Sequence, residues 1–175
     1  MRGLEIKVDK LDSIVAEINK LVAIDVMVGI PASANARDDD MNNAALGYLH
    51  ETGSPAANIP ARPFLVPGVA GAVDKYEAQL LKAIRAALDG MPKKMRAHLD
   101  AAGIIAAQAA KDMIDRGDFA PLSIPTLQAR ARRGRKGAQA ELASRAAGNA
   151  PNAANARPLI DTGQMRNSIT YVLRG

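Results

Sequence analysis

The side chains that could do catalytic chemistry in this chain are few, and each stands in an incomplete motif. Asp161-Thr162-Gly163 follows two apolar residues, which is how a retroviral-type aspartic protease presents one carboxylate of its dyad. Such a dyad needs two carboxylates that share a proton on a mostly β scaffold, whereas the chain before Asp161 has mainly helical periodicity. We therefore interpret Asp161 or Thr162 as the N-cap of a short helix, with Gly163 in its first turn. A hydrolase built on Asp161 is kept as a remote alternative.

Metal-binding motifs are equally incomplete. The chain has no cysteine and only two histidines, His50 and His98. His50-Glu51 begins like the zinc motif H-E-x-x-H, but residue 54 is a serine. The three aspartates at 38–40 lack the alternating spacing of a calcium loop and are typical of a solvated charge run. We expect no metal, no cofactor and no enzymatic activity.

A basic cluster offers a different chemistry. Five cations fall within seven residues: Arg130, Arg132, Arg133, Arg135 and Lys136. Such a cluster can neutralise phosphates, which gives sequence-independent and salt-sensitive affinity for nucleic acid, or it can contact an acidic partner. The net charge of +5 suits both, although three Tyr, two Phe and no Trp leave little for base stacking. A solvated helix end, whose cations favour the helix C-terminus, is the other interpretation.

The spacing of apolar residues predicts an α+β domain over residues 1–175. Alternation predicts strands over residues 4–8 and 169–173, and a run that is apolar on both faces predicts another over 26–30; together they would form a small, mainly antiparallel sheet. Helical spacing predicts a short amphipathic helix over 11–22, another over 44–52 that ends at Gly53, and two long helices that pack on the sheet. The stripes expected to face the core are Val69, Val73, Tyr76, Leu80, Ile84 and Leu88 on the first long helix, which opens at Pro67, and Met95, Leu99, Ala102, Ala106, Ala109 and Met113 on the second.

The part of the chain around the basic cluster is expected to be irregular. A short helix is expected from Thr126, but residues 137–157 are rich in Ala, Asn and Gly and have no apolar period. Such a stretch buries too little surface to offset its ordering entropy. We therefore expect a long flexible basic insert at 127–157. No apolar run is long enough to span a membrane, and the N-terminal residues alternate in polarity, so we expect a soluble, cytoplasmic chain at synthesis.

Arg62-Pro63-Phe64 lies in a proline-rich segment that has little conformational entropy to lose on binding. One interpretation is a partner-binding anchor, with Arg62 bound to a carboxylate or a backbone group and Phe64 inserted into a pocket. The other is intramolecular: Phe64 enters the core at the start of the first long helix.

Five strings, in order along the chain, carry a family resemblance. They are Val-Gly-Ile-Pro-Ala at 28–32, Leu-His-Glu-Thr-Gly at 49–53, Ile-Pro-Ala-Arg-Pro-Phe-Leu at 59–65, Ala-Pro-Leu-Ser at 120–123 with Thr126, and Arg-Pro-Leu-Ile-Asp-Thr-Gly-Gln-Met-Arg-Asn-Ser-Ile-Thr-Tyr at 157–171. Together they resemble the tail-component or tail-completion proteins of long-tailed bacteriophages. The last string is the most specific, and the Arg-Pro-Phe string comes next.

This resemblance implies a small α+β structural protein of the virion, located in the neck or tail, which completes the tail or joins it to the DNA-filled head. It implies a homo-oligomeric ring, with six copies favoured, that contacts neck and tail proteins such as a connector or stopper, a tail terminator or the tail tube. The basic cluster would then face the packaged DNA or an acidic neighbour. The alternative from the residues themselves is a nucleic-acid-binding module that uses residues 130–136.

Overall fold

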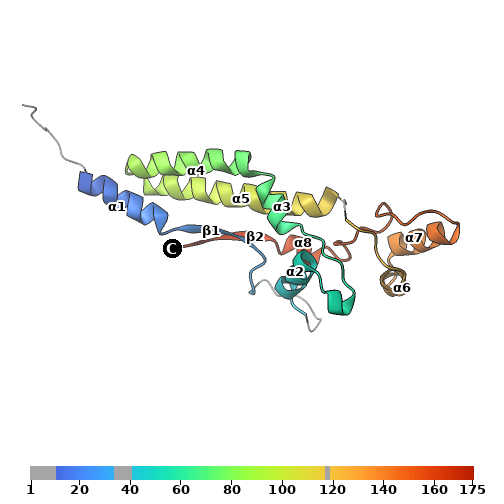
Figure 1. The fold of residues 1–175 in the computed structure, drawn as a ribbon. Coiled ribbons are helices and arrows are strands. Elements are labelled where there is room, and N and C mark those ends of the chain that lie inside the picture. The colour runs from blue at the N-terminus through green and yellow to red at the C-terminus, as the bar shows by residue number, and fades with distance from the viewer. Residues whose placement is uncertain (1–10, 34–40, 117–118) are drawn as a thin grey trace, which may run out of the picture. The chain divides into compact units, whose positions relative to one another are not determined.

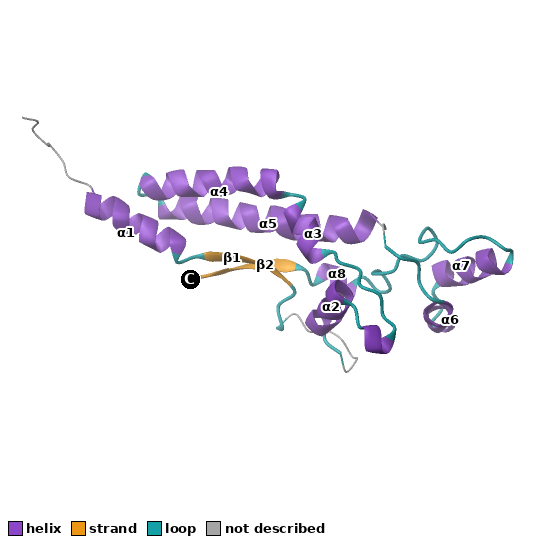
Figure 2. Ribbon diagram, in the orientation of Figure 1, coloured by secondary structure: helices purple, strands orange, loops and turns teal. Residues whose placement is uncertain are grey.

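The computed structural model describes residues 11–33, 41–116 and 119–175, and within these ranges the protein is α+β and mainly helical (Figures 1 and 2). Strand β1 (Asp25–Gly29) pairs with β2 (Thr170–Arg174) in a two-stranded antiparallel sheet. These are the second and last strands that the sequence predicts. The expected strand at 4–8 and the aspartates at 38–40 lie outside the described residues.

The chain divides into two compact units, each made of separate stretches of sequence. The first unit comprises the residues up to Val28, Ala72–Ala106 and Tyr171–Gly175, and the second comprises Gly29–Gly71 and Ala107–Thr170. Each unit therefore joins segments that lie far apart in the sequence. That the two units make one domain stays a prediction.

In the first unit, α1 (Leu11–Val22), α4 (Val73–Leu88) and the first part of α5 (Pro92–Arg116) accompany the sheet, with α4 and α5 side by side (Figure 1). Three small residues of α4, Ala83, Ala86 and Ala87, form a buried cluster with Met95 and Leu99 of α5. Small side chains at such a contact let two helix backbones approach closely. The partly buried side chains against this cluster are Leu21, Ile24, Val26, Leu80 and Leu173.

The buried face of α4 differs from the predicted one. Ile84 and Leu88, expected in the core, are exposed, and the alanines take their place. The first long helix is also divided, because α3 (Leu65–Ala70) ends at Gly71 and α4 begins at Val73. On α5 the predicted stripe holds from Met95 to Ala106, after which Ala110 and Ile114 are buried in place of Ala109 and Met113.

The second unit contains short helices joined by ordered segments. Helix α2 (Asn43–Thr52) begins where Asn42 Oδ1 accepts a hydrogen bond of 2.7 Å from the Ala45 amide. It ends at Gly53, whose φ of 73° lies in the left-handed region that favours glycine, as the sequence predicts. A 3-10 turn (Pro55–Ala57), α3 and the end of α5 follow along the chain. Asn43 Nδ2 then joins α2 to the C-terminal part of the unit by donating to Ser168 Oγ at 2.9 Å.

The prediction of a long loop at 127–157 is wrong, because most of these residues are helical. Helices α6 (Ile124–Arg132) and α7 (Lys136–Ala146) occupy most of it and pack against each other. Their small apolar core comprises Leu122, Leu127, Ala138 and Ala156. A fully buried carboxylate, Glu141, accepts hydrogen bonds from Arg145 Nε at 2.9 Å, the Asn152 amide at 3.1 Å and Asn155 Nδ2 at 3.1 Å. The segment folds around polar contacts that a search for apolar periodicity does not detect.

Candidate functional site

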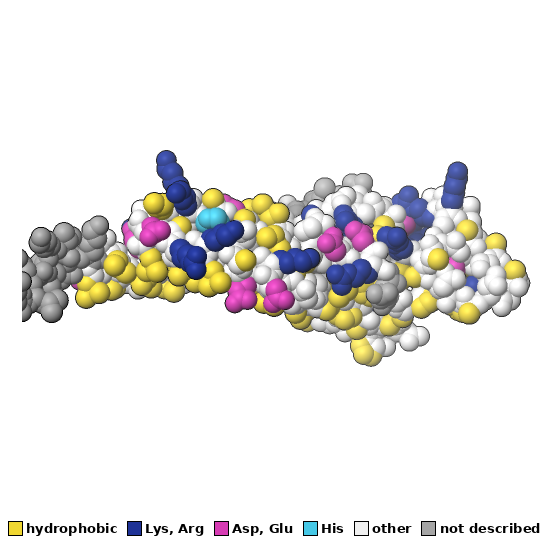
Figure 3. Space-filling model, turned by 90° about the horizontal axis from the view of Figure 1, so that it is seen from above, with side chains coloured by type: hydrophobic (Ala, Val, Ile, Leu, Met, Phe, Trp, Pro, Cys, Tyr) yellow, Lys and Arg dark blue, Asp and Glu magenta, His cyan; other side chains and the backbone are white. Residues whose placement is uncertain are grey.

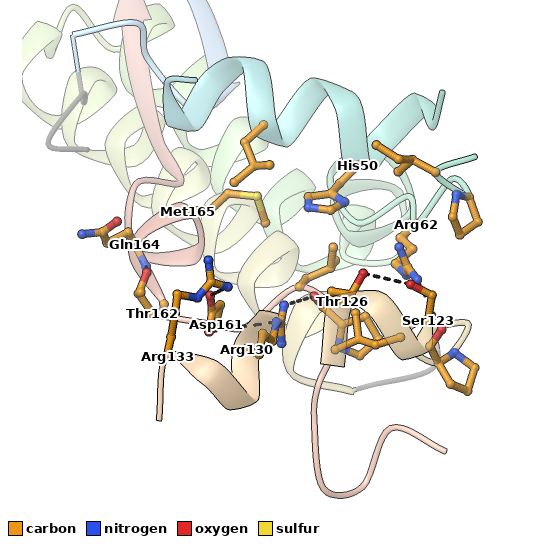
Figure 4. A pocket seen from close by; sticks show the side chains of 18 of the residues that line it. His50, Arg62, Ser123, Thr126, Arg130, Arg133, Asp161, Thr162, Gln164 and Met165 are labelled. Carbon is orange, nitrogen blue, oxygen red and sulfur yellow. Dashed lines mark hydrogen bonds and ion pairs between the residues drawn. The ribbon is translucent and has the colours of Figure 1, made fainter. Parts of the chain in front are cut away.

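A cavity of about 400 Å³ lies within the second unit (Figure 4). Its walls come from α2, residues 58–62, residues 121–133 and residues 158–165, the last of which lead into α8 (Gln164–Asn167). Four of the five strings that carry the family resemblance supply these walls. Residues from distant parts of the sequence thus converge on one pocket, which we call the arginine pocket.

Arg62 forms one side of the arginine pocket and is only 6% exposed. Its Nε and Nη2 donate to the Ala120 carbonyl oxygen at 3.2 and 3.1 Å, and its backbone amide donates to the His50 carbonyl oxygen at 2.7 Å. Burial lowers the pKa of Arg62 from its ordinary value, but a guanidinium stays charged in proteins. The cation is therefore held in place by backbone groups.

The Glu51 side chain fixes the backbone that follows the Arg-Pro-Phe string at 62–64. One carboxylate oxygen accepts from the amides of Phe64 and Leu65 at 2.8 and 2.9 Å, and the other accepts from the Val66 amide at 2.9 Å. These amides open α3, where backbone N–H groups have no partner within the helix. Phe64 is 1% exposed, in agreement with the intramolecular interpretation, and only Pro63 of the expected anchor is exposed.

Arg130, on α6, is buried as well, with 9% exposed. Its Nη1 donates to the carbonyl oxygens of Arg157 at 2.8 Å and Ile160 at 2.9 Å, and its Nη2 donates to that of Pro158 at 2.8 Å. One side chain thus holds the whole turn that begins the last string. The sequence prediction placed Arg130 in contact with nucleic acid or an acidic partner, but its donors are turned to its own chain.

Asp161 forms ion pairs with neighbouring arginines. Its Oδ2 accepts from Arg133 Nη2 at 2.8 Å, its Oδ1 accepts from Arg135 Nε at 2.9 Å, and Arg130 Nε lies 4.0 Å from Oδ1. The basic cluster is therefore split: Arg130 is buried, and the other four cations are exposed, but Arg133 and Arg135 are ion-paired with Asp161 whereas Arg132 and Lys136 form no ion pair among the described residues.

The start of α8 differs in detail from its prediction. Gly163, with φ of 79°, is the N-cap residue, and not Asp161 or Thr162. Thr162 still serves the helix start, because its Oγ1 accepts from the Gln164 amide at 3.3 Å. Asp161 is free of the capping role and pairs with arginines instead.

His50 extends from α2 toward Arg62 and Thr126 in Figure 4. Burial, followed by the positive charges of Arg62 and Arg130, lowers the pKa of His50 to about 4. The imidazole is therefore neutral at pH 7. Its Nδ1 is buried and has no hydrogen-bond partner among the described residues. In the sequence, His50 stands out only as part of an incomplete zinc motif, although it also belongs to the Leu-His-Glu-Thr-Gly string at 49–53.

No protein-family model matches this chain, and searches of curated proteins and of solved structures find no match either. Within the described ranges, no three His, Asp or Glu side chains are grouped so that they could hold a metal ion. No helix in the part of the chain that the structure covers is long and apolar enough to cross a membrane.

Proposed function

We propose that this chain is a structural subunit of a long-tailed phage, located in the neck or tail, that acts by assembling into a ring with copies of itself. The observation that carries this proposal is the apolar surface of the first unit. Two helices of that unit, α1 and α4, expose stripes of large apolar side chains to solvent. The family resemblance of the strings at 28–171 supports the same function.

The first stripe runs along α1. Leu11, Val15, Ile18 and Val22 recur at helical spacing and are exposed, Val22 by 71%. No residue of α1 is buried, although the helix also turns Ile14 and Leu21 inward. Ile14 and Leu21 lie beside these four residues on one continuous apolar stripe, so the helix is amphipathic and the described residues cover only one edge of its stripe. The free surface of α1 is therefore suited to contact with another protein.

The second stripe lies on α4. Val73, Leu81, Ile84 and Leu88 lie on one side of that helix and are all exposed, because the alanines of an adjacent face make the intramolecular contact. Figure 3 shows hydrophobic side chains gathered over this part of the molecule, among projecting Lys and Arg side chains. Monomeric proteins rarely expose large contiguous apolar patches, and such patches mark interaction sites. Copies that meet head to tail through such a surface close into a ring if the rotation between them closes.

The oligomeric state tests this proposal. Val15→Glu places a charge in the α1 stripe, and Ala16→Glu places the same charge at the next residue, which is exposed but lies off the stripe. Sedimentation velocity should show a closed oligomer for the wild type and for Ala16→Glu, and a smaller species for Val15→Glu. A wild-type chain that stays monomeric at high concentration, or equal behaviour of the two variants, would contradict assembly through this surface.

The location in the particle needs a separate test. In a lysate of the phage that encodes this chain, purified particles should contain it at a fixed copy number. Antibody labelling should mark the junction of head and tail or the adjacent tail. A chain that is abundant in the lysate but missing from the particles would contradict the proposal.

The alternative function is sequence-independent binding of nucleic acid, in which the exposed Arg132 and Lys136 would contact phosphates. If it holds, duplex DNA should retain the purified protein at low salt, and Arg132→Gln with Lys136→Gln should abolish this retention. With two phosphate contacts the logarithm of the binding constant would fall with the logarithm of salt concentration at a slope of about −2. A slope near zero would exclude it.

A further inference from the structure

We propose that the arginine pocket binds the carboxylate of an acidic peptide segment contributed by a partner protein. The site is defined by His50, Arg62, Arg130 and Arg133, with apolar walls around them. The inference does not depend on ring assembly, because every residue that defines the pocket belongs to the second unit.

The charge of the pocket is unbalanced. Three guanidinium groups line it, and Asp161 is the single carboxylate among the described lining residues. Asp161 is already shared among Arg130, Arg133 and Arg135, and no carboxylate in the described ranges forms an ion pair with Arg62. A buried cation without a counter-ion is unfavourable. An anion that enters the pocket beside Arg62 would therefore be stabilised more strongly than an anion that contacts a single exposed arginine.

The pKa of His50 reflects the positive charge of the pocket. The positive charges of Arg62 and Arg130 add to burial in holding the pKa of His50 low. The Nδ1 of this neutral imidazole is buried and has no hydrogen-bond partner among the described residues, so His50 is a polar group in the pocket wall whose surroundings a bound ligand would change. The hydroxyl groups of Ser123 and Thr126, 2.9 Å apart, line the same space.

The shape of the pocket favours a peptide over a nucleic acid. Arg62 and Arg130 are 6% and 9% exposed, and a duplex phosphate cannot reach guanidinium groups recessed in a cavity of about 400 Å³. A single side chain can do so. Eight of the other lining residues are apolar, three of them prolines, and would accept the apolar neighbours of an acidic residue. These eight are Leu46, Ile59, Pro60, Pro121, Leu122, Pro158, Leu159 and Met165.

The chain offers a direct reporter for this binding. Its only two histidines are His50, in the pocket, and His98, which lies in the first unit with its Nδ1 3.0 Å from Gln79 Oε1. Imidazole C–H resonances of the full chain at pH 7 therefore give one signal from the site and one internal control. The probes are a blocked pentapeptide with glutamate between two leucines, the same peptide with glutamine, and inorganic phosphate.

The expected result is a shift of the His50 resonance, and not of the His98 resonance, on titration with the glutamate peptide. The glutamine peptide and phosphate should need concentrations about tenfold higher or more, which corresponds to about 1.4 kcal/mol. Phosphate that binds as tightly as the glutamate peptide would overturn the peptide assignment in favour of a free anion. Equal binding of the two peptides, or no shift of His50 with any probe, would overturn the proposal altogether.

Two pairs of variants separate binding from folding. Arg133, whose side chain is 59% exposed, lines the pocket, whereas its neighbour Arg132 does not. Arg133→Gln should weaken the glutamate peptide about three- to fivefold, in keeping with the loss of one exposed charge contact, and Arg132→Gln should leave it unchanged. Asp161→Asn should strengthen binding, because it removes the competing carboxylate, and its control Asp112→Asn, outside the pocket, should not. A weaker peptide affinity in Asp161→Asn would contradict the placement of the ligand.

Discussion

Replacing Arg130 by methionine should be among the most destabilising single changes in the second unit. The guanidinium makes three hydrogen bonds of 2.8 to 2.9 Å to the carbonyl oxygens of Arg157, Pro158 and Ile160. Methionine matches the unbranched aliphatic part of the arginine side chain but has no donors, so the substitution leaves three carbonyl groups without this partner. A charged hydrogen bond contributes about 1.5–3 kcal/mol, and removing one partner of a buried charged network costs about 3–5 kcal/mol, which is the loss of stability that we expect.

The matched control is Arg132→Met, two residues away on the same helix but exposed. It should change the stability by about 0.5 kcal/mol or less. Urea denaturation followed by circular dichroism at 222 nm suits the chain because it has no Trp. Hydrogen exchange of peptides over residues 124–163 should show the loss locally, with little change in residues 73–106. If Arg130→Met is as stable as Arg132→Met, the guanidinium does not organise this turn and the reasoning fails.

Three further predictions concern other contacts. The pKa of Glu141 is held below its usual range, first by the Asn152 amide and then by the side chains that donate to it. Because the pKa is lower in the folded state, the ionised carboxylate stabilises the fold. This contribution is fully present above the unfolded-state pKa of about 4.5 and is lost as the pH falls through the folded-state pKa. Glu141→Gln should therefore flatten the acid limb of the stability curve below pH 5, which urea titrations at several pH values measure, and an unchanged acid limb would contradict it. Gly137→Ala should destabilise the protein by about 1–3 kcal/mol in thermal melts, because the added methyl group would overlap the Asn155 carbonyl oxygen. Gly68→Ala should cost a similar amount, about 1–3 kcal/mol, since its Cβ would lie 2.8 Å from the Ala110 Cα atom; a melting temperature equal to that of the wild type would show that the backbone yields without strain.

The elements with strong local signals were predictable from the sequence. The sequence predicts α1, β1, α2 and β2 close to their observed positions, because apolar periodicity, the glycine that ends α2 at Gly53 and proline boundaries act over a few residues. The helical stretch α7 was missed for the opposite reason. Its stability depends on Glu141 and on two side chains and one backbone amide that lie four to fourteen residues further along the chain, and such contacts leave no periodic pattern.

The faces of the helices could be predicted only in part. Large apolar residues on α4 were assigned to the core, and the structure buries Ala83, Ala86 and Ala87 instead. The choice between the two faces depends on how closely α5 approaches, which is a property of the packed pair and not of either sequence segment. This choice is also what leaves Ile84 and Leu88 at the surface.

By itself, the sequence determined the class of fold, the positions of most helices and strands and the scarcity of reactive side chains. It identified the strings at 49–53, 59–65, 120–126 and 157–171 as noteworthy but assigned the arginines within and near them to outward contacts. Only the tertiary structure decided that Arg62 and Arg130 turn inward. A guanidinium can satisfy several backbone carbonyls that lie 27 to 58 residues away along the chain, and the folded backbone alone brings those carbonyls within reach.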